Sequence, residues 1–340
     1  MLIEVGSPAS LPLGLVKYEN DAGSKVCLLG LTVQHPPIQI FAQAHSKLQI
    51  TGARAAKGYE QAVRFLQHHQ LKHKAEIEIE STIPNLVGLG SEALMGLSIA
   101  KALAWIHNLP SEAQETMAFA EALGLGPQHA LETWGFKQGG LLLVDTEPDT
   151  ENTIPPLLRR HEIEHAEKEA WAFVFYFPDV PEGTSETLEM DRWSGLLQAV
   201  PHLSGETGRL VDEELWPAVE NDDIETFGKS LLTLHQMNEE ALAKAGSSLS
   251  ITDENQAILD VMRDNGAVAW GQNLTGLSFY GLIKGGQASR ILRKKLRDHV
   301  GFFGGLILAT IADNRGMAEA VKDENLAHNK MTPLRLNLPE

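Results

Sequence analysis

The chain has 340 residues, of which 43% are apolar, 28 are basic and 45 are acidic, so its formal net charge is −17. This length suits one large domain or two of ordinary size, and the apolar share is sufficient for a buried core. The charge argues against binding to a nucleic-acid polymer, because such binding depends on lysine and arginine side chains that neutralise phosphates. Cys27 is the only cysteine, which excludes an internal disulfide and favours a reducing, cytoplasmic location.

Nothing in the sequence predicts export or a membrane partner. The first residues, MLIEVGSPAS, lack the basic region and apolar stretch of a secretory signal. No apolar run approaches the roughly 20 residues needed to span a bilayer. The best candidate, residues 301–312, is short and rich in glycine. We therefore expect it to be buried in the core.

The first half of the chain predicts a mixture of strands and helices. Apolar and β-branched runs predict strands at residues 25–33, 37–42, 75–81 and 139–145. Apolar residues at helical spacing predict helices at residues 57–69, 94–109 and 112–123. The strict alternation in AEIEIES points Ile77 and Ile79 inward, and Ser111 with Gln114 is expected to form a capping box.

A segment rich in proline, threonine and charge, residues 146–160, predicts a domain boundary. We therefore divide the chain into an N-terminal domain, 1–155, and a C-terminal domain, 156–340. The second domain is expected to contain strands at 171–177 and 303–312 and helices at 191–200, 211–243, 253–264 and 288–300, followed by a loose tail from Lys322. Because strands and helices do not alternate regularly, the sequence predicts the α+β class.

The sharpest local feature is a glycine loop, Pro84–Ala93 (PNLVGLGSEA), between a predicted strand and a predicted helix. Gly88 and Gly90 allow tight backbone turns and close approach to a ligand. The amides of residues 89–93 would then point outward at the start of a helix, whose partial positive charge attracts phosphate. No Gly-Lys-Ser/Thr follows, so this is not a Walker loop. The loop predicts a phosphate site, unless its glycines serve only to pack an ordinary strand–loop–helix turn.

The loop resembles the second motif of the GHMP superfamily of small-molecule kinases, P-x-x-x-G-L-G-S-S-A. Four other segments resemble, in the same order, motifs of one branch of this superfamily, the β-ribofuranosylaminobenzene 5′-phosphate synthases. They are Pro8–Leu15 (PASLPLGL), Gly124–Gly126 with Phe136–Asp145 (FKQGGLLLVD), Trp216–Gly228 (WPAVENDDIETFG) and Gly271–Gly281 (GQNLTGLSFYG). The chain is therefore identified as a divergent member of this branch.

The resemblance implies a two-lobed GHMP fold with a ligand cleft between the lobes. It implies an enzyme, and a homodimer, that binds a phosphorylated small molecule. The implied reaction joins phosphoribosyl diphosphate to an aminobenzoate and releases CO2 and pyrophosphate, in the biosynthesis of a methanopterin-type cofactor. Mg²⁺ is the implied cofactor.

The resemblance also assigns roles to individual residues. The phosphate-binding group is Gly88, Leu89, Gly90, Ser91, Glu92, Ala93, Gly271, Gln272, Gly276 and Ser278. Ser91 and Glu92 are the implied Mg²⁺ ligands, since oxygen atoms suit this ion. Glu132 stands where GHMP kinases place a catalytic aspartate, and Asp145 is a second catalytic candidate. By family position, Asp21 and Asp223 are further carboxylates that would bind magnesium or orient the substrate, although each also suits a turn.

Departures from the family pattern leave three functions open. Ser10 and Pro12 replace an arginine and a histidine, Leu125 replaces an arginine, and Glu92 replaces a small polar residue. The first function is the synthase. The second is an ATP-dependent small-molecule kinase with ATP on the Gly88 loop and Glu132 as base. The third is a non-catalytic binding subunit of the same fold.

Several other signals favour ordinary structural roles. Residues 161–165 (HEIEH) match the zincin pattern, but charged neighbours and a nearby proline favour a solvated segment. The histidines at positions 68, 69 and 73 suit an exposed helix end. The basic residues at 290–297 suit a solvated helix face, or else a rim that steers an anionic substrate. Cys27 is expected to be a buried thiol.

Overall fold

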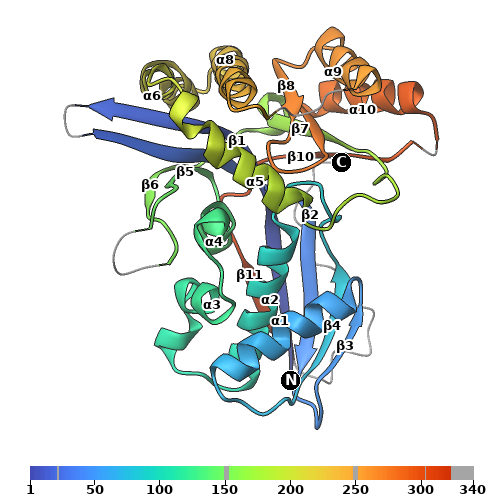
Figure 1. The fold of residues 1–340 in the computed structure, drawn as a ribbon. Helices are drawn as coiled ribbons and strands as arrows, with labels where there is room; N and C mark the ends of the chain where they lie inside the picture. Colours follow the sequence, from blue (N-terminus) through green and yellow to red (C-terminus); the bar gives the residue numbers. More distant parts are fainter. Residues whose placement is uncertain (21–22, 149–152, 248–251, 303, 323–340) are drawn as a thin grey trace.

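Two β-sheets, each covered by helices, form two lobes joined by a long N-terminal hairpin (Figure 1). The computed structural model describes residues 1–20, 23–148, 153–247, 252–302 and 304–322. The predicted α+β class is confirmed, because the sheets mix hairpins with strands that are distant in sequence. Asp21 and most of the tail expected to be loose lie outside the described residues.

The lower sheet is built on β1 (Leu2–Asn20) and β2 (Gly23–Gln43), which pair antiparallel along almost their whole length. Its strand order is β11-β1-β2-β4-β3, and β5 and β6 extend it from β2. The other strands are β3 (Gln49–Gly52), β4 (Glu76–Ser81), β5 (Leu141–Asp145), β6 (Leu157–His161) and β11 (Ala318–Lys322). The two strands predicted at 25–33 and 37–42 are one continuous strand, because β1 provides a partner for both parts. Ile77 and Ile79 are buried, as the alternation predicted.

Four helices accompany the lower sheet: α1 (Ala55–His68), α2 (Ser91–Ile106), α3 (Thr116–Ala122) and α4 (Ala130–Gln138). Helix α2 starts at the glycine loop itself, three residues before the predicted start. The predicted capping box is wrong. Residues Ser111–Gln114 form a separate 3₁₀ turn, and the Gln114 side chain donates to the carbonyl of Leu109 (2.6 Å).

The upper sheet is antiparallel, in the order β10-β7-β9-β8. Its strands are β7 (Trp171–Phe177), β8 (Ala269–Gln272), β9 (Phe279–Lys284) and β10 (Leu306–Thr310). The helices of this lobe are α5 (Leu188–Ala199), α6 (Glu206–Leu210), α7 (Trp216–Glu220), α8 (Ile224–Lys244), α9 (Asp253–Asp264) and α10 (Gly286–Val300). The segment expected to be buried at 301–312 forms the edge strand β10, in which Ile307 is buried but Leu306 is exposed.

The single helix predicted at 211–243 is interrupted. Residues Val211–Leu215 form a π-helical turn, and Asp222 has a left-handed backbone (φ 57°) that ends α7. Helix α8 then begins with Asp223 as its N-cap, whose carboxylate accepts the Thr226 amide (3.0 Å). The turn chemistry of Asp223 is therefore structural, and its predicted role as a magnesium or substrate carboxylate is not supported.

The lobes share strands and a core. β6 and β11, both beyond residue 155, belong to the lower sheet. The largest hydrophobic cluster runs from Ile3 through α2 and α8 to Ala312. The predicted division at 155/156 therefore falls between β5 and β6, two strands that pair with each other. No described helix is long and apolar enough to cross a membrane.

Candidate active site

The glycine loop turns as its sequence predicts. Gly88 and Gly90 both have φ of 78°, in the left-handed region that favours glycine, and Gly90 directly precedes α2. The carbonyl of Leu89 accepts the amide of Ser10 (3.2 Å), which fixes the loop to β1. The first amides of α2 have no acceptors within the helix, so this end of α2 attracts an anion.

The second glycine loop packs directly on the first. Asn273 donates its side-chain amide to the carbonyl of Gly88 (3.0 Å), and Ser278 donates its hydroxyl to the carbonyl of Val87 (2.6 Å). A Cβ added at Gly276 would lie 2.0 Å from the amide nitrogen of Gly88. The close approach of the two backbones is therefore the reason for glycine at position 276. In this arrangement, Gly276 and Ser278 hold the first loop in place.

Glu132 lies against the same loop. A Cβ added at Gly90 would lie 2.4 Å from Glu132 Cγ, so position 90 has no room for a side chain. Glu132 Oε2 is buried and, within the described structure, has no hydrogen-bond partner. Burial, together with the nearby charge of Glu189, raises the Glu132 pKa to about 7. A carboxyl that exchanges its proton near neutral pH therefore adjoins the anion-attracting end of α2.

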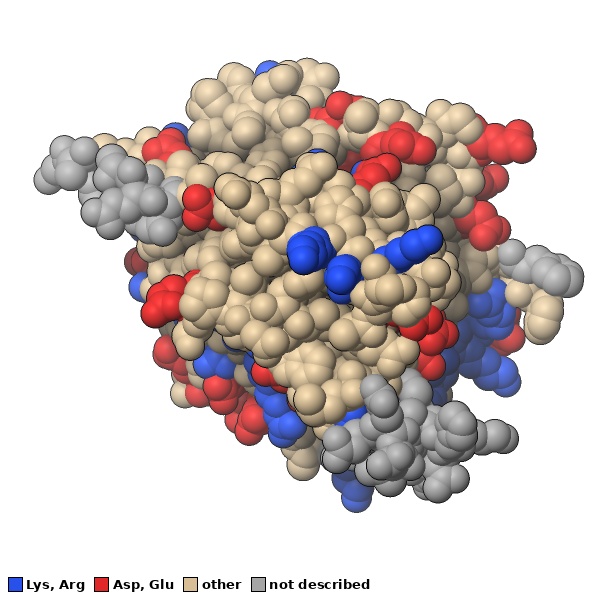
Figure 2. Space-filling view, turned by 90° about the horizontal axis from the view of Figure 1, so that it is seen from below, with Lys and Arg blue, Asp and Glu red and all other residues tan. Residues whose placement is uncertain are grey.

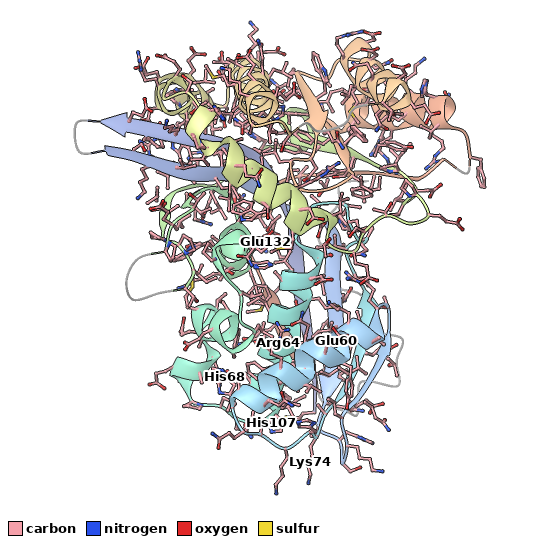
Figure 3. All side chains as sticks on the ribbon, viewed as in Figure 1. Glu60, Arg64, His68, Lys74, His107 and Glu132 are labelled. Atoms are coloured by element: carbon pink, nitrogen blue, oxygen red, sulfur yellow. The ribbon has the colours of Figure 1, made fainter. Side chains whose placement is uncertain are left out.

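Figure 3 shows where this carboxyl lies in the molecule. Glu132 is close to α5, at the level where the two lobes meet, whereas His68 and His107 lie toward the far end of the lower lobe. The candidate site is therefore at the junction of the lobes, and His68 and His107 are remote from it.

Two cations adjoin the start of α2, and both are already neutralised. Arg54 donates to the hydroxyl of Ser91 (3.0 Å) and pairs with the carboxylate of Glu92 (3.3 Å). Lys57 also pairs with Glu92 (3.3 Å). A phosphate that displaced Glu92 would find both cations ready to bind it.

The same contacts test the expected magnesium site. The oxygens of Ser91 and Glu92 face Arg54 and Lys57, and a bound cation would meet these positive charges at close range. Among the described residues, no group of three or more histidine, cysteine, aspartate or glutamate side chains could hold a metal ion. The pair as arranged does not fit Mg²⁺, because cationic side chains already bind both groups.

Three contributors to the site carry no recognisable signal in the sequence. Glu189 of α5 accepts the amide of Gly88 (2.7 Å), and burial raises its pKa. Arg192, one turn further along α5, donates to the carbonyl of Gly276. His129 precedes α4, and burial lowers its pKa to about 4, so it is neutral at pH 7. Only the tertiary structure brings α5 to a loop 101 residues earlier in the chain.

The structure does not bring Asp145 to the loop. Asp145 lies opposite Cys27 at the end of β5 and pairs with Lys25 (2.8 Å). Ser10, which bonds to the loop, lies opposite Thr32. Cys27 and Thr32 are five residue steps apart along β2, which corresponds to about 17 Å of strand, so Asp145 is remote from the loop.

The contacts of the remaining predicted features are typical of structural roles. His161 ends β6 and His165 stacks on Trp171 (5.2 Å between ring centroids), so the HEIEH segment is not the helix that a zincin needs. In α10, Arg297 donates to the carbonyls of Gly301, Phe302, Gly304 and Gly305, and its basic neighbours are exposed. Cys27 is buried, as predicted, and burial raises its pKa to about 12.

Comparison with known proteins agrees with this geometry. Residues 55–131, which include α1, the loop and the start of α4, match the family model of the GHMP kinases N terminal domain. This segment therefore resembles the N-terminal domain of the GHMP kinases, as its glycine-loop motif indicated. The β-ribofuranosylphenol 5′-phosphate synthase of Archaeoglobus fulgidus is 21% identical over 242 residues, which are 69% of this chain and 76% of that protein.

Solved GHMP-type structures confirm the fold. The galactokinase of Lactococcus lactis, solved with galactose, aligns with a TM-score of 0.65 at 12% identity, over 93% of this chain and 95% of that one. The homoserine kinase of Cytophaga hutchinsonii aligns with a TM-score of 0.62 at 17% identity, over 94% and 97%. The mevalonate diphosphate decarboxylase of Enterococcus faecalis aligns with a TM-score of 0.61 at 13% identity, over 95% and 99%. At these identities the likeness establishes the GHMP fold and no particular substrate.

Proposed function

We propose that this protein is an enzyme that binds a phosphorylated small molecule at the Gly88–Ala93 loop and transfers a phosphoribosyl group. The observation that carries the proposal is the meeting of two features: the anion-attracting start of α2, and the buried carboxyl of Glu132 with a pKa of about 7. The similarity to a ribofuranosylphenol phosphate synthase supports phosphoribosyl diphosphate as the donor and a hydroxy- or aminobenzoate as the acceptor.

In this reaction the bond between C1 of the ribose and pyrophosphate breaks. The acceptor carbon that bears the carboxylate forms the new carbon–carbon bond to C1. The bond to the carboxylate then breaks, and its electron pair restores the aromatic ring as CO2 leaves. Pyrophosphate gains negative charge as it departs, and the start of α2 with Arg54 and Lys57 stabilises that charge.

Glu132 has a defined task if the acceptor is a phenol. In its ionised form it accepts the hydroxyl proton, which makes the ring more electron-rich, and it returns the proton to the product. Its pKa of about 7 suits both transfers at neutral pH. Two carboxylates must leave the loop before the substrate can bind. A phosphate oxygen takes the place of the Glu189 carboxylate as acceptor for the Gly88 amide. Other phosphate oxygens take the place of the Glu92 carboxylate beside Arg54 and Lys57.

A GHMP-type kinase is the second candidate, and one observation favours it. The carboxyl of Glu132 adjoins the loop, where a kinase base would take the proton of an alcohol that attacks ATP. Glu132 acts as a base in both reactions. The synthase and the kinase are therefore distinguished by which phosphorylated substrate binds, phosphoribosyl diphosphate or ATP. A non-catalytic subunit would need neither substrate.

Calorimetric titration of the full chain with phosphoribosyl diphosphate and with ATP, each in the presence of Mg²⁺, tests the proposal. A parallel assay follows ¹⁴CO2 release from carboxyl-labelled 4-hydroxybenzoate and 4-aminobenzoate. We expect phosphoribosyl diphosphate to bind and CO2 to be released, and Glu132→Gln to bind the donor but to turn it over about 10²- to 10⁴-fold more slowly. Binding of ATP alone would overturn the synthase in favour of the kinase, and no binding of either would overturn both.

A further inference from the structure

A cavity of about 230 Å³ lies in the upper lobe between α8, α9 and the edge strand β8. Its walls carry the apolar side chains of Leu232, Leu259 and Trp270, and its polar groups include Glu239 and Gln272. At roughly 30 Å³ for each water in the liquid, the space corresponds to about seven or eight waters or one small ring.

One wall of the cavity is formed where the His235 ring packs against a glycine, Gly271. Gly271 has no side chain, and a Cβ there would lie 2.9 Å from Nδ1 of His235. The His235 ring is fixed by a 2.8 Å hydrogen bond between Nε2 and the hydroxyl of Tyr280. Burial lowers the His235 pKa to about 4, so this wall of the cavity is neutral at pH 7. The wall is therefore preformed and carries no positive charge.

Two residues that line the cavity carry acceptors with no donor from the described protein, one buried and one exposed. The Gln272 side chain is only 8% exposed, and its Oε1 is buried without a hydrogen-bond partner in the described structure. Such a group is costly to leave unsatisfied, which makes it a strong indication of a ligand. Glu239, on α8, is an exposed residue that forms no ion pair with any described residue, and desolvation on its cavity side raises its pKa.

The other polar groups do not meet this need. The side-chain amide of Gln236 donates to Glu240 (3.0 Å), and that of Gln256 donates to Asp260 (3.2 Å). The described residues that line the cavity include no lysine or arginine. The cavity therefore presents acceptors and negative charge beside apolar walls.

We propose that this cavity binds a small primary amine with a flat, apolar body. The ammonium group donates to the carboxylate of Glu239 and to Oε1 of Gln272, since it has three donors and a positive charge. The apolar body packs beside Leu232 and Leu259, and the Trp270 ring adds attraction for a cation.

The charge separates this site from the one proposed for catalysis. A benzoate acceptor would bring its carboxylate toward Glu239 with no lining cation to neutralise it. The two sites are nonetheless neighbours, because Gln272 directly precedes Asn273, which binds the carbonyl of Gly88. The amine site does not depend on the identity of the reaction.

Three probes of similar shape and different charge test the proposal: benzylamine, benzyl alcohol and benzoate. Binding to the full chain is measured by ligand-observed NMR and calorimetry at pH 7. We expect benzylamine to bind more tightly than benzyl alcohol and benzoate not to bind. Glu239→Gln should weaken benzylamine binding by about ten- to a hundredfold, the effect of one hydrogen bond to a charged group. Gln272→Met should weaken benzylamine and benzyl alcohol alike.

Glu240→Gln is the matched control. It removes one charge from the neighbouring position of α8, from a side chain that accepts the Gln236 amide and is not among the residues that line the cavity. A general attraction of amines to an acidic protein would give equal losses in Glu239→Gln and Glu240→Gln, and would overturn the proposal. Benzoate binding as tight as that of benzylamine would overturn it as well.

Discussion

At the scale of single residues, the burial of Glu132 determines how the proposed reaction depends on pH. Its pKa of about 7 means that the ionised form, which acts as base, becomes the major form only above neutral pH. We predict that the rate rises with pH around a midpoint near 7. Glu132→Gln should lower kcat by about 10²- to 10⁴-fold, the usual contribution of a general base, and should remove this midpoint.

Glu121→Gln is the control, because Glu121 is an exposed carboxylate on α3, away from the loop. Steady-state rates between pH 5 and 9 provide the measurement. An unchanged rate in Glu132→Gln would show that Glu132 has no part in proton transfer.

The same carboxyl makes stability depend on pH in the direction opposite to that of most acidic groups. Its folded pKa, about 7, lies above the ordinary value of 4.5, so the folded protein holds the proton more tightly. Its contribution is fully present below pH 4.5 and is lost as pH rises toward 7. At 1.36 kcal/mol for each pKa unit, this loss is about 3 kcal/mol. We predict that Glu132→Gln unfolds at higher urea concentration than the natural protein at pH 8, with little difference at pH 4.5.

Glu189 occupies a position that a phosphate oxygen would take. Its carboxylate accepts the Gly88 amide, and it lies close enough to Glu92 for their charges to interact. Glu189→Gln keeps an acceptor for this amide and removes the charge. We predict that it tightens binding of phosphoribosyl diphosphate by about tenfold, a difference of about 1.4 kcal/mol.

Calorimetry of Glu189→Gln beside Glu186→Gln, an exposed carboxylate on the same segment, isolates the local effect from that of net charge. Weaker binding in Glu189→Gln would instead make this carboxylate a contact that the ligand needs.

At the scale of elements, the contact between the two glycine loops is required for the site. A methyl group at Gly276 would meet the backbone of Val87 and Gly88 at about 2 Å, where no flexible side chain can yield. We predict that Gly276→Ala destabilises the protein by about 1–3 kcal/mol and weakens binding of phosphoribosyl diphosphate. Thermal unfolding and calorimetry measure the two effects.

Gly195→Ala on α5 is the control, since its added methyl would have its nearest neighbour, Ser247 Oγ, at 3.5 Å. If Gly276→Ala binds the donor as the natural protein does, the second loop does not support the first.

Periodicity in the sequence was sufficient to predict several elements. The strand at 171–177 and the helix at 253–264 match β7 and α9 residue for residue, because apolar spacing marks them; the structure adds a Thr252 cap to the helix. The continuity of β2 and the presence of β11 were not predictable, since both depend on a partner strand far along the chain. The break before α8 escaped prediction because Asp222 adopts a left-handed backbone in an otherwise helical pattern.

The residues of the candidate site also divide into those that a local sequence pattern marks and those that depend on tertiary contacts. The loop and Glu132 were identified from sequence because glycine spacing and a motif mark them. Glu189, Arg192 and Arg54 act through side chains that only folding brings to the loop, and no local pattern announces them.

At the scale of the whole molecule, the net charge of −17 is compatible with binding phosphates. Figure 2 shows a face of the lower lobe on which a few Lys and Arg side chains lie near the centre, while both acidic and basic side chains lie toward the rim. The cations that matter to a phosphorylated ligand, Arg54 and Lys57, are held beside the loop by Glu92. A small phosphorylated ligand needs only these local charges and backbone amides, whereas a nucleic-acid polymer needs an extended basic surface.

The lobes are expected to unfold together because the hairpin of β1 and β2 serves both. Asn238 of α8 is buried and bonds to the amide and the carbonyl of Leu15 in β1 (2.8 and 3.0 Å). We predict one calorimetric transition for the natural protein, with equal van't Hoff and calorimetric enthalpies. Asn238→Ala leaves two backbone groups of Leu15 without partners, at about 1–3 kcal/mol each, and should lower the Tm of that single transition. Two separate transitions in the natural protein would contradict this prediction. They would show that residues 1–155 and 156–340 unfold as two cooperative units, even though β5 and β6 pair across that boundary.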